Sequence, residues 1–214
     1  MIKTTKEDYF NSVRTDISLL LPDKIDKAIE IGCGSGNTLQ WLKKERGCRW
    51  TCGVELSPDA ATKAKDKVEL LIEGDIEKIE LPLEKEDFDL LLCLDVLEHL
   101  IDPWSVLKKL SFYVKRNGVV IVSIPNVRDV NVLGPLIIRG QWNYRDEGVL
   151  DLAHLRFFTK KTAINLVERS GFKIDKVLSN GLGLNSKKGI LNMLTIGVFK
   201  SFFETQFLIK AIKS

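Results

Sequence analysis

Apolar runs alternate with segments of helical spacing along the chain from Ala28 to about Ile124. In each repeat, a short apolar run leads through a turn containing Gly or Asp into a helical segment, which is the order of βα units. The runs are predominantly apolar, as parallel strands are when helices cover both faces of a sheet. The predicted strands are 27–31, 50–54, 68–72, 88–94 and 119–124. This pattern predicts an α/β fold with a mostly parallel sheet.

Outside this repeat the pattern changes. Residues 1–22 carry apolar side chains at helical spacing from Phe10 onward and end at Pro22, which predicts an N-terminal amphipathic helix. Residues 126–158 show no clear period and are predicted to form a long loop or small cap, a kind of segment that is usually functional. Residues 184–203 are predicted to form one apolar helix or two short ones. The remaining predicted elements are a helix at 159–170 and strands at 172–178 and 206–212.

Composition and charge narrow the class of protein. The 214 residues are 44% apolar and 29% charged, which is typical of one folded domain. The net charge of +3 is spread along the chain without a basic stripe, so no nucleic-acid partner is expected. Met1–Tyr9 lack the apolar core of a secretory signal, and a cytoplasmic location is expected. The uncharged stretch 189–199 is too short to span a bilayer, although its flanking lysines leave peripheral membrane contact open.

Cysteine and histidine usage gives no sign of a metal site. The four cysteines form no C-x-x-C pair, and the chain has only two histidines. Both features argue against a zinc site. We therefore expect reduced, buried thiols and no bound metal.

The strongest chemical signal is a glycine turn between a predicted strand and helix, Glu30-Ile31-Gly32-Cys33-Gly34-Ser35-Gly36-Asn37. Its glycines allow a sharp turn and close approach of a ligand to a helix N-terminus. A dinucleotide site favours the spacing G-x-G-x-x-G/A. In this chain Asn37 stands where the last small residue would be expected, so the spacing argues against a dinucleotide.

Two acidic positions follow at intervals of about twenty residues. Glu55 ends the second predicted strand, where a carboxylate can accept both hydroxyls of a ribose. Gly74-Asp75-Ile76 closes the third strand and offers a carboxylate and an apolar side chain, which suit an adenine ring. All three features fall at one edge of the sheet and together indicate an adenosine site.

These motifs resemble those of class I S-adenosylmethionine-dependent methyltransferases. The resemblance also rests on the segments Leu94–Leu100 and Ser123–Asn126, and it covers nearly the whole chain. It implies a single domain over residues 1–214 with a Rossmann-like, seven-stranded, mostly parallel sheet. Helices would cover both faces, and the last strand, from Gln206, would be antiparallel. The chain is also similar to small-molecule O-methyltransferases of ubiquinone biosynthesis.

A narrower resemblance lies in residues 140–148 and 150–159, which are similar to methyltransferases that accompany polysaccharide and natural-product glycosylation enzymes. It implies a sugar-like or other small-molecule hydroxyl as the methyl acceptor. The acceptor pocket would be built by residues 1–22, 126–158 and 184–203, with the N-terminal helix covering the cofactor. We expect the protein to be a monomer or a homodimer.

The family resemblance implies a set of cofactor-binding residues. The glycine turn would hold the methionine part, the second strand end the ribose, the third strand end the adenine, and the fourth strand end the sulfonium. The implied residues are Tyr9, Arg14, Glu30, Gly32, Cys33, Gly34, Gly36, Glu55, Leu56, Gly74, Asp75, Ile76, Leu94, Asp95 and His99.

Methyl transfer to a hydroxyl also needs a base. A histidine is suited to that role near neutral pH. We predict His154 as the base, with Asp151 as its orienting partner and His99 as a further candidate. The alternatives are a loop-capping role for His154 and an ordinary ion pair between Asp151 and Arg156. At the level of the whole protein, a catalytically silent nucleotide-binding regulator and an NAD-dependent oxidoreductase remain open.

Overall fold

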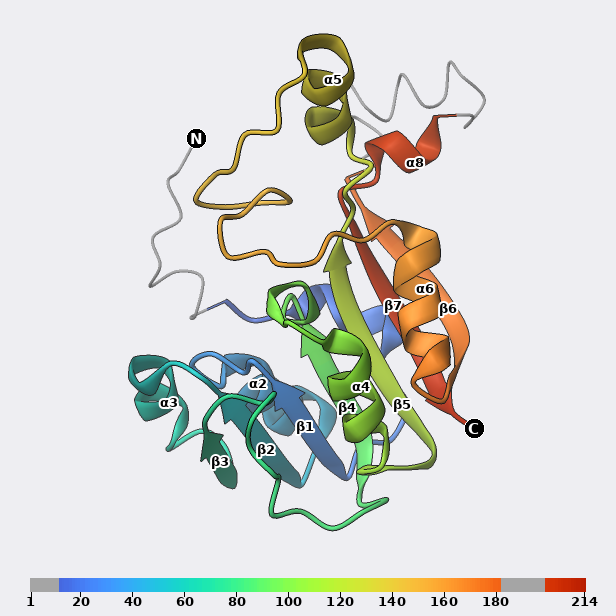
Figure 1. The fold of residues 1–214 in the computed structure, drawn as a ribbon. Helices are drawn as coiled ribbons and strands as arrows, with labels where there is room; N and C mark the ends of the chain where they lie inside the picture. The colour runs from blue at the N-terminus through green and yellow to red at the C-terminus, as the bar shows by residue number, and fades with distance from the viewer. Residues whose placement is uncertain (1–11, 182–198) are drawn as a thin grey trace.

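The computed structural model describes residues 12–181 and 199–214 and contains a seven-stranded sheet in the order β3-β2-β1-β4-β5-β7-β6 (Figure 1). The strands are β1 Lys27–Ile31, β2 Trp50–Glu55, β3 Leu70–Glu73, β4 Phe88–Leu94, β5 Val114–Pro125, β6 Phe172–Asn180 and β7 Gln206–Lys213. Strand β7 runs antiparallel to β5 and β6, and the pairs among β1 to β5 are parallel. The predicted Rossmann-like sheet with an antiparallel last strand is therefore confirmed.

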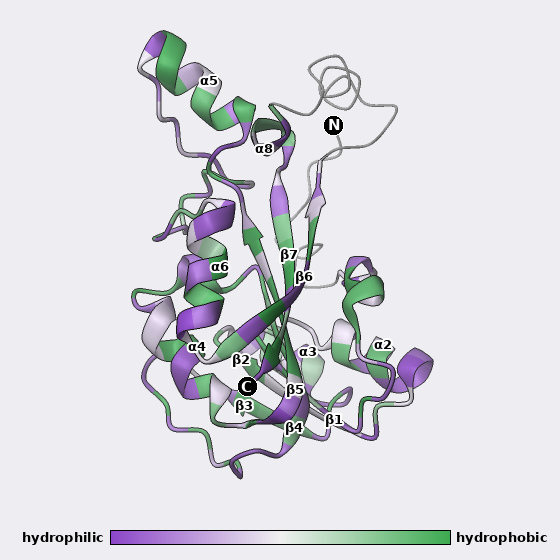
Figure 2. Cartoon of the chain, turned by 90° about the vertical axis from the view of Figure 1, so that its right-hand side faces the viewer, coloured by the Kyte–Doolittle hydropathy of each residue, from purple (hydrophilic) through white to green (hydrophobic). Residues whose placement is uncertain are grey.

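Helices cover both faces of the sheet, as predicted. On one face lie η1 (Thr15–Leu20), α2 (Asn37–Arg46) and α3 (Pro58–Ala64), and on the other α4 (Pro103–Ser111) and α6 (Lys160–Arg169). The other described helices are η2 (Leu97–His99), α5 (Val130–Arg139) and α8 (Lys200–Phe203). Figure 2 shows the apolar strands between these two layers of helices. No helix within residues 12–181 and 199–214 has the length and apolar character to cross a bilayer.

The two apolar cores follow from the alternation of side chains along each strand. In β4, Leu91 faces the core under α4 and α6, whereas Leu90 and Leu92 face the core under α2. All four described thiols are free and buried within these layers, as expected for reduced cysteines.

Several predicted boundaries need correction. The predicted N-terminal helix is present in the described residues as a 3-10 helix, Thr15–Leu20, which is shorter than predicted. Its buried residues, Ile17 and Leu20, are three apart, which is the repeat of a 3-10 helix. Strand β3 begins at Leu70 instead of Val68, and β5 extends back to Val114.

The segment 126–158 contains a helix, α5, where no regular element was predicted. Asp129 caps its start by accepting from the Asn131 amide at 2.7 Å, and Gly140 ends it in the left-handed conformation. Pro135 lies inside the helix and hides the helical pattern in the sequence. Both views place α5 beyond the carboxyl end of β5 (Figures 1 and 2). Of the predicted cap at 184–203, residues 184–198 lie outside the described residues.

Gly53 in β2 provides a test of how closely the sheet packs under the glycine turn. A Cβ atom at Gly53 would lie 2.6 Å from Sγ of Cys33, which is itself buried in the turn. We expect Gly53→Ala to lower the free energy of unfolding by about 1–3 kcal/mol, measured by urea denaturation. Gly134→Ala is the control because its Cβ would meet only Val130 at 3.9 Å. Equal stability of the two variants would contradict this packing.

Candidate functional site

The glycine turn joins β1 to α2 in a left-handed backbone path. Gly32, Gly34 and Gly36 have φ angles of 69°, 54° and 73°, which side chains with a Cβ rarely adopt. The amides of Gly32 and Cys33 donate to the carbonyl of Val54, at 2.8 and 3.2 Å, and fasten the turn to β2. The turn therefore presents bare backbone at the carboxyl edge of the sheet.

Glu55, at the end of β2, holds this turn in place. Its side chain is buried, and one carboxylate oxygen accepts from the Gly34 amide at 2.8 Å. The other oxygen accepts from the Ser57 amide at 2.8 Å, at the start of α3. The predicted proximity of Glu55 to the turn is thus seen in the structure, whereas its contact with a ribose stays a prediction.

Glu30 is a buried carboxylate directly before the turn. It is 3% exposed, and its Oε2 atom has no hydrogen-bond partner among the described residues. The pKa of Glu30 is raised to about 8. Burial raises it most, the nearby Arg14 lowers it, and the carboxylate of Glu55 raises it. A buried carboxylate in this state fits a ligand that brings its own positive charge.

The third strand end lies at the same edge. The amide of Gly74 donates to the carbonyl of Glu55 at 2.8 Å, and Ile76 is buried. Asp75 forms an ion pair with Lys78 at 2.9 Å, and this contact lowers the pKa of its carboxyl group. The side chain of Leu56 is 66% exposed. Its predicted contact with the adenine would therefore form when the cofactor binds.

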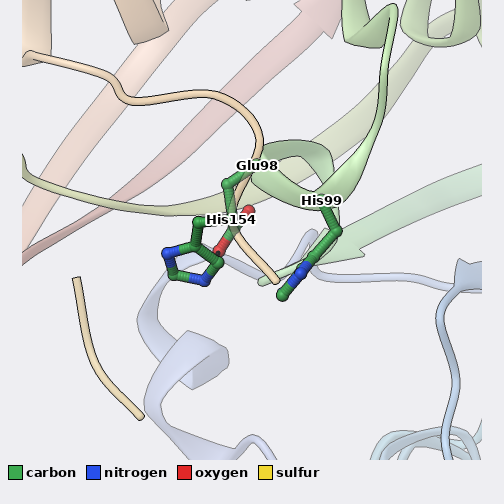
Figure 3. Close-up of side chains that lie close together, drawn as sticks. All are labelled: Glu98, His99 and His154. Atoms are coloured by element: carbon green, nitrogen blue, oxygen red, sulfur yellow. Dashed lines mark ion pairs between the residues drawn. The ribbon is translucent and has the colours of Figure 1, made fainter. Parts of the chain in front are cut away.

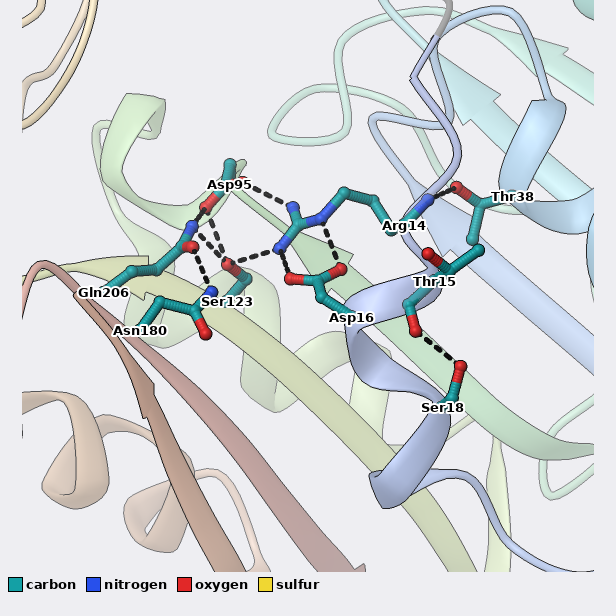
Figure 4. Close-up of polar contacts among 9 residues, drawn as sticks. All are labelled: Arg14, Thr15, Asp16, Ser18, Thr38, Asp95, Ser123, Asn180 and Gln206. Carbon is teal, nitrogen blue, oxygen red and sulfur yellow. Dashed lines mark hydrogen bonds and ion pairs between the residues drawn. The ribbon is translucent and has the colours of Figure 1, made fainter. Parts of the chain in front are cut away.

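A polar cluster joins the carboxyl ends of β4 and β5 to the start of β7 (Figure 4). Arg14 donates to Asp95 at 2.5 Å and to the hydroxyl of Ser123 at 3.1 Å. Gln206 donates to Asp95 at 2.5 Å and to Ser123 at 2.7 Å. Sequence reasoning assigned Arg14 and Asp95 to the site. It placed Ser123 in a motif segment and Gln206 at the start of the last strand, but gave neither a role in the site.

Asp95 follows β4 with a φ angle of 55°, which is unusual for a residue other than glycine. Such strain persists where several contacts hold the residue, and it is concentrated at functional sites. Leu94, directly before it, is buried. Tyr9, predicted to cover this edge together with Arg14, lies outside the described residues.

The structure brings both histidines together with a buried carboxylate. Glu98 and His99 lie in η2, and His154 comes from the loop 140–158 (Figure 3). The imidazole rings of the two histidines meet edge to face, with centroids 4.6 Å apart. The amides of Leu155 and Arg156 donate to the Glu98 carbonyl at 2.9 and 3.0 Å and fix the loop on η2. The two histidines predicted as candidates therefore share one centre.

Glu98 was not predicted from the sequence. It is 1% exposed, and neither of its carboxylate oxygens has a hydrogen-bond partner in the described part of the chain. Its Oε1 lies 4.0 Å from Nε2 of His154. Burial raises the pKa of Glu98 well above its ordinary value. The pKa of His99 is lowered, mainly by burial and to a smaller extent by the neighbouring His154.

The expected contact between Asp151 and the imidazole of His154 is absent among the contacts that the structure describes. The Asp151 carboxylate accepts from the Ala153 amide at 2.7 Å. Nδ1 of His154 instead faces the carbonyl of Val149 at 2.9 Å. The carbonyl of Val149 therefore orients His154 in this structure, because the turn at 149–154 bends the chain back on itself.

Comparisons with known proteins identify the family and the fold. Residues 6–177 match a family model described as a methyltransferase domain. Two ubiquinone biosynthesis O-methyltransferases, from Bradyrhizobium diazoefficiens and Neisseria meningitidis serogroup C, are 32% and 27% identical over 47% and 52% of this chain. The matched regions span 40% and 52% of those relatives.

One solved structure shows the same fold over nearly the whole chain. It is described as an S-adenosylmethionine-dependent methyltransferase from Archaeoglobus fulgidus. Its TM-score is 0.67 at 19% identity, over 98% of this chain and 95% of that one.

Proposed function

Because this chain belongs to the methyltransferase-domain family, we propose that it transfers a methyl group from S-adenosylmethionine to an oxygen of a small-molecule acceptor. S-Adenosylmethionine is the cofactor that the family and the fold imply. The observation that carries the proposal is the glycine turn, clamped by Glu55 and backed by the buried Glu30, whose Oε2 atom has no hydrogen-bond partner among the described residues. This arrangement offers bare backbone and a buried carboxyl group whose ionised form a cationic ligand would stabilise.

The residues present fit the cofactor in charge and shape. S-Adenosylmethionine carries an ammonium and a sulfonium, and Oε2 of the buried Glu30 has no hydrogen-bond partner among the described residues. We assign the turn to the methionine part and Glu55 to the ribose. Asp75 and Ile76, with Leu56, would flank the adenine. When bound, the cofactor supplies a methyl group already activated by its positive sulfur, so positioning accounts for much of the acceleration.

The acceptor side of the site supports an oxygen nucleophile. A hydroxyl must lose its proton to attack, and the centre of Glu98, His99 and His154 lies at the end of β4 beside the polar cluster. We assign the activation of the acceptor oxygen to this centre. The relatives named above are O-methyltransferases by description, which supports the choice of oxygen.

A sugar or sugar-like natural product is the acceptor class that we propose. In the loop 140–158, Trp142 packs against Phe157 with ring centroids 5.3 Å apart, and Tyr144 is 49% exposed. Partly exposed aromatic faces of this kind suit the apolar face of a sugar ring. Phe158, at the end of the same segment, is buried in the core.

Calorimetry with S-adenosylmethionine and its demethylated product tests the cofactor assignment. We expect both to bind, and NADH to give no heat. We expect Glu55→Ala to weaken binding at least about tenfold, because the amides of Gly34 and Ser57 lose their acceptor. Glu73→Ala is the matched control: Glu73 pairs in register with Glu55 on the adjacent strand, but its side chain is exposed.

Two results would refute the function. One is the absence of binding of either cofactor form to the folded wild-type protein, and the other is tight binding of NADH. The acceptor is then identified with a labelled-methyl transfer assay against sugars, nucleotide sugars and phenols. Label found only on nitrogen or carbon would contradict the assignment to oxygen.

A further inference from the structure

The centre of Glu98, His99 and His154 gathers three groups that can donate electron pairs (Figure 3). Glu98 is buried, and both of its carboxylate oxygens lack a hydrogen-bond donor among residues 12–181 and 199–214. A buried carboxylate without a donor is costly unless a cation accompanies it. The centre therefore contains a buried carboxylate to which no described group donates a hydrogen bond.

The hydrogen bonds of the two histidines leave a lone pair on each ring. Nδ1 of His99 lies 3.1 Å from the carbonyl of Ala153, and Nδ1 of His154 lies 2.9 Å from the carbonyl of Val149. A carbonyl oxygen only accepts, so in the neutral rings each Nδ1 carries the proton and each Nε2 carries the lone pair. Histidines that bind metals typically donate their other ring N–H to such a carbonyl, which fixes the tautomer.

The distances within the centre suit a metal ion. One ligand atom from each of the three residues lies within 4.8 Å of the other two. For any such triangle there is a point no more than about 2.8 Å from all three atoms, compared with about 2.0–2.2 Å for zinc bound to nitrogen or carboxylate oxygen. Side-chain shifts of about 0.6 Å would complete the coordination.

We propose that Glu98, His99 and His154 hold a divalent transition-metal cation of the zinc type, which binds the acceptor oxygen. Two histidines and one carboxylate leave positions open for a substrate, as in catalytic zinc sites. The small number of histidines does not exclude such a site, because Glu98 supplies the third ligand. This inference makes His154 a metal ligand, in place of the base predicted from the sequence.

The role in methyl transfer rests on the proposed function. The acceptor hydroxyl would bind at an open position, where the cation lowers its pKa and its proton leaves to a solvent base. The oxygen then attacks the methyl carbon. A C–O bond forms as the C–S bond of the sulfonium breaks, and the electron pair of that bond stays on the sulfur of the thioether product.

Metal binding is measured on the full chain after chelator treatment, by calorimetry with zinc chloride and by the visible spectrum with cobalt chloride. We expect one equivalent of Zn²⁺ to bind, and the Co²⁺ spectrum to lack a thiolate charge-transfer band. Glu98→Gln and His154→Ala are each expected to weaken binding on the order of 100-fold. Glu147→Gln, the same chemical change at an exposed position of the loop, is expected to leave binding unchanged.

The outcomes separate this inference from the proposed function. Stoichiometric Zn²⁺ binding that depends on Glu98 and His154 supports the metal site. Absent binding, or equal affinity of folded Glu98→Gln and wild type, overturns it. A thiolate band in the Co²⁺ spectrum also overturns it, since that places the ion on cysteine. Calorimetry with S-adenosylmethionine on the same preparations tests the function independently, because the glycine turn contains none of these ligands.

Discussion

Replacing His154 by alanine is expected to lower the rate of methyl transfer by a factor of about 10² to 10⁴, with little change in cofactor affinity. His154 belongs to the centre to which we assign the activation of the acceptor, and its side chain is 8% exposed, so water does not readily replace it. The glycine turn and Glu55 lie in other segments of the chain. The measurement is single-turnover transfer of labelled methyl, accompanied by calorimetry with the demethylated cofactor. Leu155→Ala, at the exposed neighbouring position, is the control.

Asp151→Asn tests which group orients the imidazole of His154: Asp151, as predicted from the sequence, or the carbonyl of Val149, as in the structure. If Asp151 oriented the imidazole, this variant would lose nearly as much activity as His154→Ala. Because Nδ1 of His154 faces the carbonyl of Val149 instead, we expect a loss of about tenfold or less. If His154→Ala transferred the methyl group at the wild-type rate, His154 would have no role in the reaction. A simultaneous loss of cofactor binding would assign it a structural role.

The fold could be predicted from the sequence because its information is local. The strands are short apolar runs, and the caps at Ser57 and Asp102 are specified by the residue itself and the following proline. Both caps are present in the structure, where each side chain accepts from an amide three residues further on. Helix α5 was missed because Gly134 and Pro135 interrupt its pattern, whereas Asp129 and Gly140 fix its ends in the folded chain.

The glycine turn and the strand-end carboxylates could be placed at one edge of the sheet for the same reason, since they follow buried strands at regular intervals. The meeting of the two histidines with Glu98 could not be predicted. His99 and His154 are 55 positions apart, and their meeting depends on an irregular loop that pairs with the backbone of Glu98. Glu98 lies beside His99 in the motif segment Leu94–Leu100, but nothing in that segment shows that its side chain is buried. Its importance follows from burial without a hydrogen-bond donor in the described part of the chain, which is a property of the folded state.

The second large effect concerns Glu30 and the dependence of stability on pH. The pKa of Glu30 is raised from 4.5 to about 8 by burial in the folded protein. Below pH 4.5 the carboxyl group is protonated in both states and burial carries no charge penalty. As the pH rises from 4.5 to 8, the unfolded chain ionises first, so the folded protein loses stability over this window and not above it. The full shift corresponds to a loss of up to about 5 kcal/mol.

Glu30→Gln should remove this loss, because the amide keeps the shape of the side chain without the charge. We therefore expect the variant to match the wild type at pH 4.5 and to be more stable by several kcal/mol at pH 9, as measured by urea denaturation without cofactor. Glu98, whose pKa is also raised, contributes equally to both proteins and cancels in the comparison. Glu73→Gln, at an exposed strand end, should follow the wild type. Parallel curves for Glu30→Gln and the wild type would mean that Glu30 finds a donor in solution. The uncompensated charge that we assign to the cationic cofactor would then not exist.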